Sequence, residues 1–327
     1  MRKTATLFLL FLCTFSLVAQ EGKSAFDFLQ LPTSVRSAAL GGTNVSIIEN
    51  DLALIYQNPA FLGKEMDLTF SAGYLSYIAD ISMGNIAFAK ALGERSAFGI
   101  GVIYSNFGKM SAYSEDNVKL GDLNASDISG NVFFSRDLTE RIRGGVAAKF
   151  IYSNYEYNSS IGIGVDLGLN YYNPEKNLSV GLTGKNLGRQ IKAYETELAN
   201  LPWEIQLGIS QKLAHAPIRY SITGVHLNRW QFYNLEGEKN AFTANFLKHL
   251  VFGVELLLSD NFWVGLGYNT KRASDLHLSE GNKFSGFSVG AGLKVKAFSF
   301  SCSMGQYHPS ATSLMFNIST SLVEMKL

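Results

Sequence analysis

The sequence is poor in cysteine, with only Cys13 and Cys302 among its 327 residues. Cys13 lies in an N-terminal apolar stretch that we expect to be removed on export. Cys302 is then the single thiol of the mature chain, which excludes an internal disulfide. The exported protein must therefore be stable by other means.

The sequence after residue 20 also lacks any run of about 18 apolar residues, the length that a membrane-spanning helix needs. This absence excludes an α-helical membrane protein. The 28 basic and 27 acidic side chains almost cancel, which argues against a nucleic-acid-binding surface. Residues 1–20 combine Arg2 and Lys3 with an apolar stretch and a small residue, Ala19, and we expect them to form an export signal peptide.

Sequence motifs typical of catalytic and metal-binding sites are missing as well. None of the five histidines stands at metal-ligand spacing from another, and neither a Gly-x-Ser-x-Gly elbow nor a P-loop occurs. We therefore expect no catalytic residues, no metal and no cofactor, and the chain is interpreted as a non-enzyme. A rim hydrolase that uses His308 with Ser310 is the disfavoured alternative, because serine is common in these loops.

The sequence does contain many segments in which apolar residues alternate with glycine or polar residues. In "SIGIGVDLGLNYY", residues 160–172, apolar side chains occupy every second position, which is the period of a strand with two different faces. The same pattern recurs after residue 66 and predicts fourteen strands, at about 67–75, 82–91, 96–106, 127–136, 141–153, 160–172, 177–187, 202–213, 217–227, 248–258, 261–270, 284–295, 297–305 and 311–323.

The connections between these segments alternate between tight turns and longer loops. The long connections include 107–126, 188–201, 228–247 and 271–283. Short turns at one end and long loops at the other are typical of a transmembrane antiparallel β-barrel. We predict such a barrel over residues 67–327, in the outer membrane, with the long loops facing the cell exterior; a large soluble β-protein is the alternative.

The inward face of the predicted barrel carries mostly glycine and small polar residues. About fourteen strands enclose more space than such side chains fill, so the lumen needs water or a plug. Residues 21–66 precede the first strand and are the predicted plug. Within them Arg36 has two interpretations. It gates a pathway by pairing with an inward carboxylate such as Asp166, Glu204 or Glu255, or it ties the plug to the wall through a charge-assisted hydrogen bond.

Turn residues occur at two places in the predicted plug. Gly41 and Gly42 indicate a bend where side chains would clash, and Asn58–Pro59 indicates a turn. The apolar residues before them have two interpretations: they line a pocket for a hydrophobic molecule, or they form the packing core of the plug. These residues are Phe26, Phe28, Leu29 and Leu31.

The stretch "FDFLQLPTSVRSAALGG" followed by "NPA" resembles the start of the PorV/PorQ family of outer-membrane proteins, and "FDFLQLP" is most similar to its PorQ branch. The positions that carry the resemblance are Pro32, Arg36, Ala38, Ala39, Gly41, Gly42, Asn58, Pro59 and Ala60. The resemblance implies a FadL-like fold of fourteen strands with an N-terminal hatch.

The resemblance also implies a function. It indicates a scaffold of the type IX secretion attachment complex that holds a PorZ-like surface protein, with PorU and PorV as further candidate partners. Cargo would then be processed and anchored to lipopolysaccharide. The alternative is a FadL-like channel for a hydrophobic small molecule.

The loop at 228–247 is too long for a simple turn and is rich in aromatic residues, which are favoured anchors in protein interfaces. Two interpretations remain open: a partner-binding surface, or a lid over the barrel mouth. The aromatic residues are Trp230, Phe232, Tyr233, Phe242 and Phe246.

Overall fold

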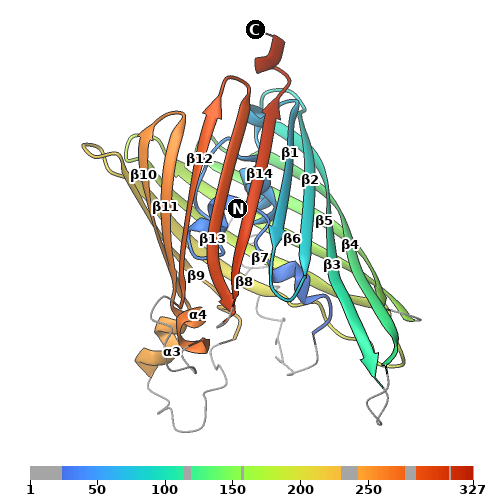
Figure 1. Cartoon of the computed structure of the whole chain (residues 1–327). Helices are drawn as coiled ribbons and strands as arrows, with labels where there is room; N and C mark the ends of the chain where they lie inside the picture. Colours follow the sequence, from blue (N-terminus) through green and yellow to red (C-terminus); the bar gives the residue numbers. More distant parts are fainter. Residues whose placement is uncertain are drawn as a thin grey trace, which may run out of the picture.

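The computed structural model describes residues 24–113, 119–155, 158–229, 242–276, 285–308 and 311–326. Fourteen antiparallel strands follow one another around a closed barrel, and β1 pairs with β14 to complete it (Figure 1). The predicted fold class is therefore confirmed. The strands are β1 (Thr69–Ser76), β2 (Ser82–Ala91), β3 (Ser96–Tyr113), β4 (Lys119–Asp137), β5 (Ile142–Tyr155), β6 (Asn158–Asn173), β7 (Leu178–Lys192), β8 (Glu204–Lys212), β9 (Ile218–Gly224), β10 (Leu250–Ser259), β11 (Phe262–Asn269), β12 (Phe287–Val295), β13 (Phe298–His308) and β14 (Ala311–Ser321).

The two ends of the barrel differ. Six short connections, from β2–β3 to β12–β13, lie at one end together with the start of β1 and the end of β14; we call it the turn end. The opposite end, the loop end, carries the helices α3 (Phe242–Lys248) and α4 (Thr270–Asp275) (Figure 1). Among the described residues, none of the helices is long and apolar enough to cross a membrane.

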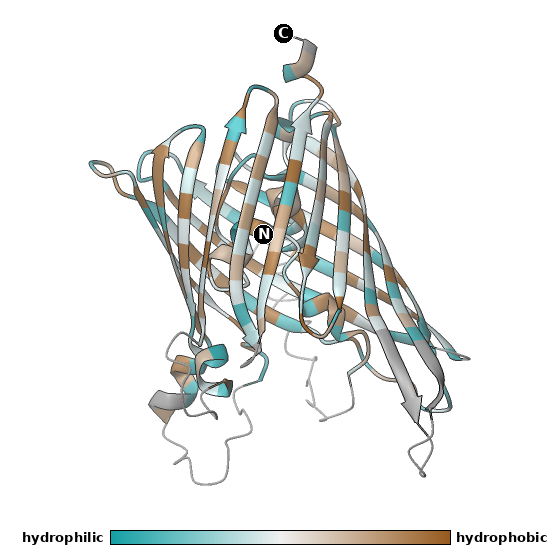
Figure 2. Ribbon diagram, in the orientation of Figure 1, coloured by the Kyte–Doolittle hydropathy of each residue, from teal (hydrophilic) through white to brown (hydrophobic). Residues whose placement is uncertain are grey.

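The wall has an apolar outer face and a polar inner face. Along β6, Ile163, Leu167 and Leu169 are exposed on the outside, whereas Asp166 and Asn170 are buried on the inside. Figure 2 shows the same banding on neighbouring strands. An apolar exterior suits lipid, and closure of the sheet pairs the backbone groups that a bilayer would otherwise leave without partners.

One predicted loop is wrong. Residues 107–126 were expected to form a long connection, but β3 continues to Tyr113 and β4 begins at Lys119, so that the two strands extend their hairpin beyond the rest of the wall. The pairing register shifts after Asn106, and Gly108 adopts a φ of 72°. A bulge of this kind breaks the alternation that marks a strand in the sequence, which is why the extension was missed.

Residues 24–66, which we call the plug segment, lie within the barrel (Figure 1). They form the short helices η1 (Asp27–Gln30), α2 (Val35–Ala39), η2 (Leu52–Tyr56), η3 (Pro59–Phe61) and η4 (Lys64–Met66). Side chains of Ser34, Asp51 and Asn58 accept backbone N–H groups at the starts of α2, η2 and η3, which satisfies donors that the first turn of a helix leaves free.

Glycines of the inner wall allow the plug segment to approach the strands closely. A Cβ atom on Gly181 would lie 1.7 Å from the carbonyl oxygen of Val45, and one on Gly145 would lie 2.3 Å from the backbone of Pro59. Both distances are far below van der Waals contact. The bare glycine face of these strands is thus occupied by backbone of the plug segment.

We therefore expect Gly181→Ala to destabilise the folded protein by about 1–3 kcal/mol, the usual cost of overpacking. Gly130→Ala is the matched control, because a Cβ on Gly130 meets no atom within 4 Å. Urea titration in detergent, followed by the gel mobility of the folded barrel, measures both variants. Equal stability of the two would show that the plug segment does not press on the wall at Gly181.

Candidate functional site

The site is organised by α2 of the plug segment. The Ser34 hydroxyl accepts the backbone N–H groups of Arg36 and Ser37 at 3.2 and 3.5 Å and itself donates to Asp51 at 3.2 Å. Ser37 returns a hydrogen bond to the Ser34 carbonyl at 2.9 Å. The capped first turn fixes the direction in which the Arg36 side chain leaves the helix.

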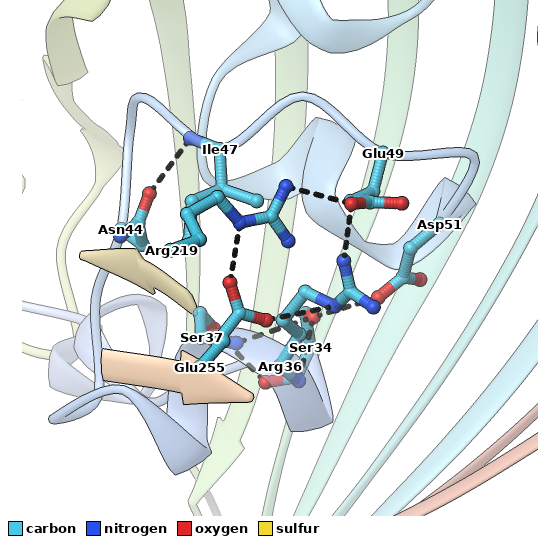
Figure 3. A network of polar contacts seen from close by, with 9 residues as sticks. All are labelled: Ser34, Arg36, Ser37, Asn44, Ile47, Glu49, Asp51, Arg219 and Glu255. Atoms are coloured by element: carbon cyan, nitrogen blue, oxygen red, sulfur yellow. Dashed lines mark hydrogen bonds and ion pairs between the residues drawn. The ribbon is translucent and has the colours of Figure 1, made fainter. Parts of the chain in front are cut away.

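Arg36 belongs to a ring of four charges, two from the plug segment and two from the wall (Figure 3). Its guanidinium lies 3.1 Å from Glu49 and 3.5 Å from Glu255 of β10. Arg219 of β9 closes the ring with hydrogen bonds of 2.7 Å to each of the same two carboxylates. Positive and negative groups alternate around this ring, which we call the plug–wall ion ring.

The plug–wall ion ring is largely removed from solvent. The side chains of Arg36 and Glu255 are 8% and 1% exposed, and the Arg36 guanidinium also lies 4.5 Å from the ring centre of Trp263. Two arginines and two glutamates cancel in charge, which limits the desolvation penalty that buried ions otherwise carry. Each side is neutral by itself, because Arg36 lies beside Glu49 in the plug segment and Arg219 lies beside Glu255 in the wall. Docking gives each of these four groups a second partner of opposite charge.

The pKa values of two carboxylates in the plug segment, Glu49 and Asp51, shift in opposite directions. Burial raises the pKa of Glu49, but Arg36 and Arg219 outweigh it and lower that pKa to about 2. Burial raises the pKa of Asp51 above its ordinary value, although Arg36 acts against it. Glu49 therefore keeps its charge in acid that would neutralise an ordinary glutamate.

Of the three carboxylates considered as partners of Arg36, the structure brings Glu255 to it. Asp166 instead lies 2.7 Å from Lys149, and Glu204 lies 3.0 Å from His226. The remaining ring members, Glu49 and Arg219, were missed. The strand pattern could have predicted Arg219, because it is a charged residue at an inward position of a strand. Glu49 could not be predicted in this way, because it lies in irregular backbone that has no periodic pattern.

The "NPA" turn fastens the plug segment at a second place. Asn58 is buried, and its side-chain oxygen accepts the N–H of Ala60 at 3.0 Å. Its amide group donates to the carbonyl of Val45 at 3.0 Å and to that of Leu169 on β6 at 3.4 Å. Pro59 follows as the first residue of η3. Asn58 thus joins two parts of the plug segment and the wall.

A third contact lies at Gly41 and Gly42, which have φ angles of 102° and 101°. The Gly41 N–H donates to Ser288 of β12 at 2.9 Å. The Gly41 carbonyl accepts hydrogen bonds from Asn269 at 3.0 Å and from Arg272 of α4 at 2.9 Å. The bend therefore exposes backbone groups that the wall and α4 bind.

The apolar residues at the start of the plug segment pack into the core between plug and wall. Phe26, Phe28 and Leu29 are 4–6% exposed in one hydrophobic cluster, and Leu31 packs against it. Pro32 borders a small polar cavity at the loop end. This placement matches the packing interpretation of these four apolar residues more closely than a lining for a ligand pocket.

Cavities described within the lumen are small and polar. One of about 110 Å3 lies at the loop end, and one of about 170 Å3 adjoins Arg36, Glu49 and Trp263. An apolar groove of about 670 Å3 includes Phe300 and Phe316, whose side chains are exposed on the outer face of the wall. None of these three spaces is an apolar passage through the barrel.

The candidate partner loop is described in part. Phe242 and Phe246 lie on α3 with 74% and 43% of their surface exposed, and their rings stack at 6.4 Å. Trp230, Phe232 and Tyr233 lie outside the described residues. Among the residues described, groups of three or more histidine, cysteine or acidic side chains that could hold a metal ion do not occur.

Solved structures show which class of protein this architecture defines. The Pseudomonas putida toluene transporter TodX superposes with a TM-score of 0.56 at 11% identity, over 91% of this chain and 99% of that one. A Pseudomonas aeruginosa FadL homologue gives 0.53 at 11% identity, over 91% and 98%. At such identity the likeness shows the fold alone: the chain is a closed β-barrel of the FadL-like type.

The sequence places the chain in a particular family of such barrels. The family described as "Type IX secretion system membrane protein PorP/SprF" matches residues 53–314, and the chain belongs to it. No curated protein matches the chain. The matched range begins after residues 26–42, so most of the positions that resemble the PorV/PorQ family lie outside it, and that finer resemblance stays a prediction.

We expect Glu255→Gln to destabilise the docked plug by about 3–5 kcal/mol, because it leaves buried arginine charge without its partner. Adding Arg219→Gln should recover part of the loss, since the pair is coupled. Glu324→Gln, in the exposed pair with Lys294, is the control and should cost at most about 1 kcal/mol. Urea titration of the four proteins tests this; strictly additive losses would contradict the ring.

We also expect a pH dependence specific to Glu49. Its pKa is lowered on folding from 4.5 to about 2, so its charge stabilises the docked plug above pH 4.5, and that contribution is lost as the pH falls toward 2. The stability difference between the parent protein and Glu49→Gln should be constant above about pH 5 and shrink below it. A difference that does not change with pH would refute this assignment.

Proposed function

We propose that the chain is a non-enzymatic scaffold of the type IX secretion attachment complex, which holds a PorZ-like protein at the cell surface with PorU and PorV as further partners. Membership of the PorP/SprF family is the observation that carries the proposal. The resemblance of the plug segment to the PorV/PorQ family supports its finer part. Cargo would be processed and anchored to lipopolysaccharide by the partners.

The fixed plug favours a scaffold over a channel. The plug segment is held to the wall by the plug–wall ion ring, by Asn58 and by Gly41. Release would break these contacts together, including the pairs Arg36–Glu255 and Glu49–Arg219. A barrel whose lumen is closed in this way offers its loops, more than its interior, to other molecules.

The loop end supplies a surface for docking. In the proposed orientation it faces the cell exterior, and Phe242 and Phe246 stand exposed on α3 as a stacked aromatic pair. Aromatic residues are frequent hot spots of protein interfaces. We assign this pair to the contact with the surface partner.

A channel for a hydrophobic molecule is the second candidate. Its support is the fold shared with the toluene transporter TodX and with a FadL homologue. Such a function requires the plug segment to move, since the described cavities of the lumen are small and polar.

Affinity purification of the tagged protein from gently solubilised outer membranes tests the proposal. A large surface protein and secretion components, identified by mass spectrometry, should accompany the parent chain. Replacing both Phe242 and Phe246 by serine should reduce the recovered partner by about tenfold or more, because hot-spot aromatics each contribute at least about 1–2 kcal/mol.

Leu92→Ser is the matched control, an exposed apolar residue at the turn end that should leave recovery unchanged. A lone barrel that carries a hydrophobic molecule, identified in an organic extract, would contradict the scaffold and support the channel.

A further inference from the structure

The polar cavity at the loop end is enclosed by three parts of the molecule. The plug segment contributes Gly42, the wall contributes Lys185 of β7 and Tyr307 of β13, and α4 contributes Arg272. Its volume of about 110 Å3 exceeds the roughly 10–15 Å3 that a single water molecule needs. The space is thus large enough for a small polyatomic group.

The lining of this cavity is rich in positive charge. Lys185, Lys271 and Arg272 face one carboxylate, that of Glu204. Lys271 is neutralised by Asp275 at 2.5 Å, and Glu204 lies 3.0 Å from His226. Even with His226 uncharged, the two remaining cations outnumber the single carboxylate.

Two side chains that line the cavity each have a polar atom without a protein partner. Arg272 Nη1 and Tyr307 Oη are buried and make no hydrogen bond within the described part of the chain. The other terminal nitrogen of Arg272 donates to Gly41, and the guanidinium stacks on the Tyr307 ring at 3.8 Å. These contacts hold both side chains in place, so the two donors are preorganised for a further partner.

Lys185 adds a third donor to the cavity. It is 6% exposed and likewise makes no hydrogen bond to any described residue. Its neighbours along the inner wall, Asp166 and Glu204, are already engaged by Lys149 and His226. A buried ammonium group without hydrogen bonds is costly, and a bound anion would supply them.

We propose that this cavity binds a phosphate group. An arginine, a lysine and a hydroxyl from three different elements suit a tetrahedral oxyanion, which accepts charge-assisted hydrogen bonds from several directions. The anion would lie where the plug segment, the wall and α4 meet. This site is independent of the proposed scaffold role, and the phosphate can belong to a free ion or to a lipid headgroup.

Calorimetric titration of the full chain in an uncharged detergent with sodium phosphate, against sodium chloride of equal ionic strength, tests the proposal. The parent protein should bind phosphate saturably. Tyr307→Phe removes the hydroxyl and keeps the ring that stacks on Arg272, and Lys185→Gln removes one charge. Each should weaken binding by about tenfold or more, the usual worth of a hydrogen bond to a charged group.

Tyr220→Phe and Lys294→Gln at the turn end are the matched controls and should bind as the parent does. A phosphorus assay of the purified proteins separates the two sources. Phosphorus that accompanies the parent and is lost from Lys185→Gln identifies a lipid headgroup, whereas binding of added phosphate without it identifies the free ion. Neither saturable binding nor bound phosphorus, or binding equal in all variants, would overturn the proposal.

Discussion

Pairing of every backbone N–H and C=O group within the bilayer is the constraint on which the structure depends. Fourteen strands satisfy it by closing on themselves, with β1 against β14. Closure creates a second problem, because the enclosed space is wider than the small inward side chains can fill. The plug segment occupies that space, and the bare glycine positions of the wall are where its backbone fits, as at Gly145 and Gly181.

The contacts that hold the plug segment combine tight packing with balanced charge. The plug–wall ion ring takes Arg36 and Glu49 from one side and Arg219 and Glu255 from the other. Each half is a neutral pair by itself, and docking adds the contacts Arg36–Glu255 and Arg219–Glu49 across the two. Because opposite charges must meet for this to happen, the ring specifies how the plug segment sits as much as it adds stability. In the proposed scaffold role other molecules bind at the loop end, which carries the aromatic pair of α3 and the polar cavity lined by Arg272 of α4.

Periodicity predicted the wall well because a strand between lipid and a polar lumen has two unlike faces along its whole length. The approximate positions of all fourteen strands follow from it. It failed where the wall leaves that environment: β3 and β4 run on beyond a bulge near Asn106, and the alternation stops there although the pairing continues. In the plug–wall ion ring, Arg36 was predicted from the sequence, and Glu255 was among its candidate partners. Glu49 was not predicted, because it lies in irregular backbone that has no periodic pattern.

By itself the sequence determined the fold class, since alternation, tight turns and the absence of long apolar runs leave few other architectures. It also indicated that residues before the first strand belong inside the barrel. Only the tertiary structure decided which side chains meet: Arg36 with Glu255 and not with Asp166 or Glu204, and Arg272 with Gly41 across the mouth of the barrel. Such pairings depend on how the plug segment folds against strands that lie far from it in the sequence. The alternation of apolar and polar residues within one segment does not predict contacts of this kind.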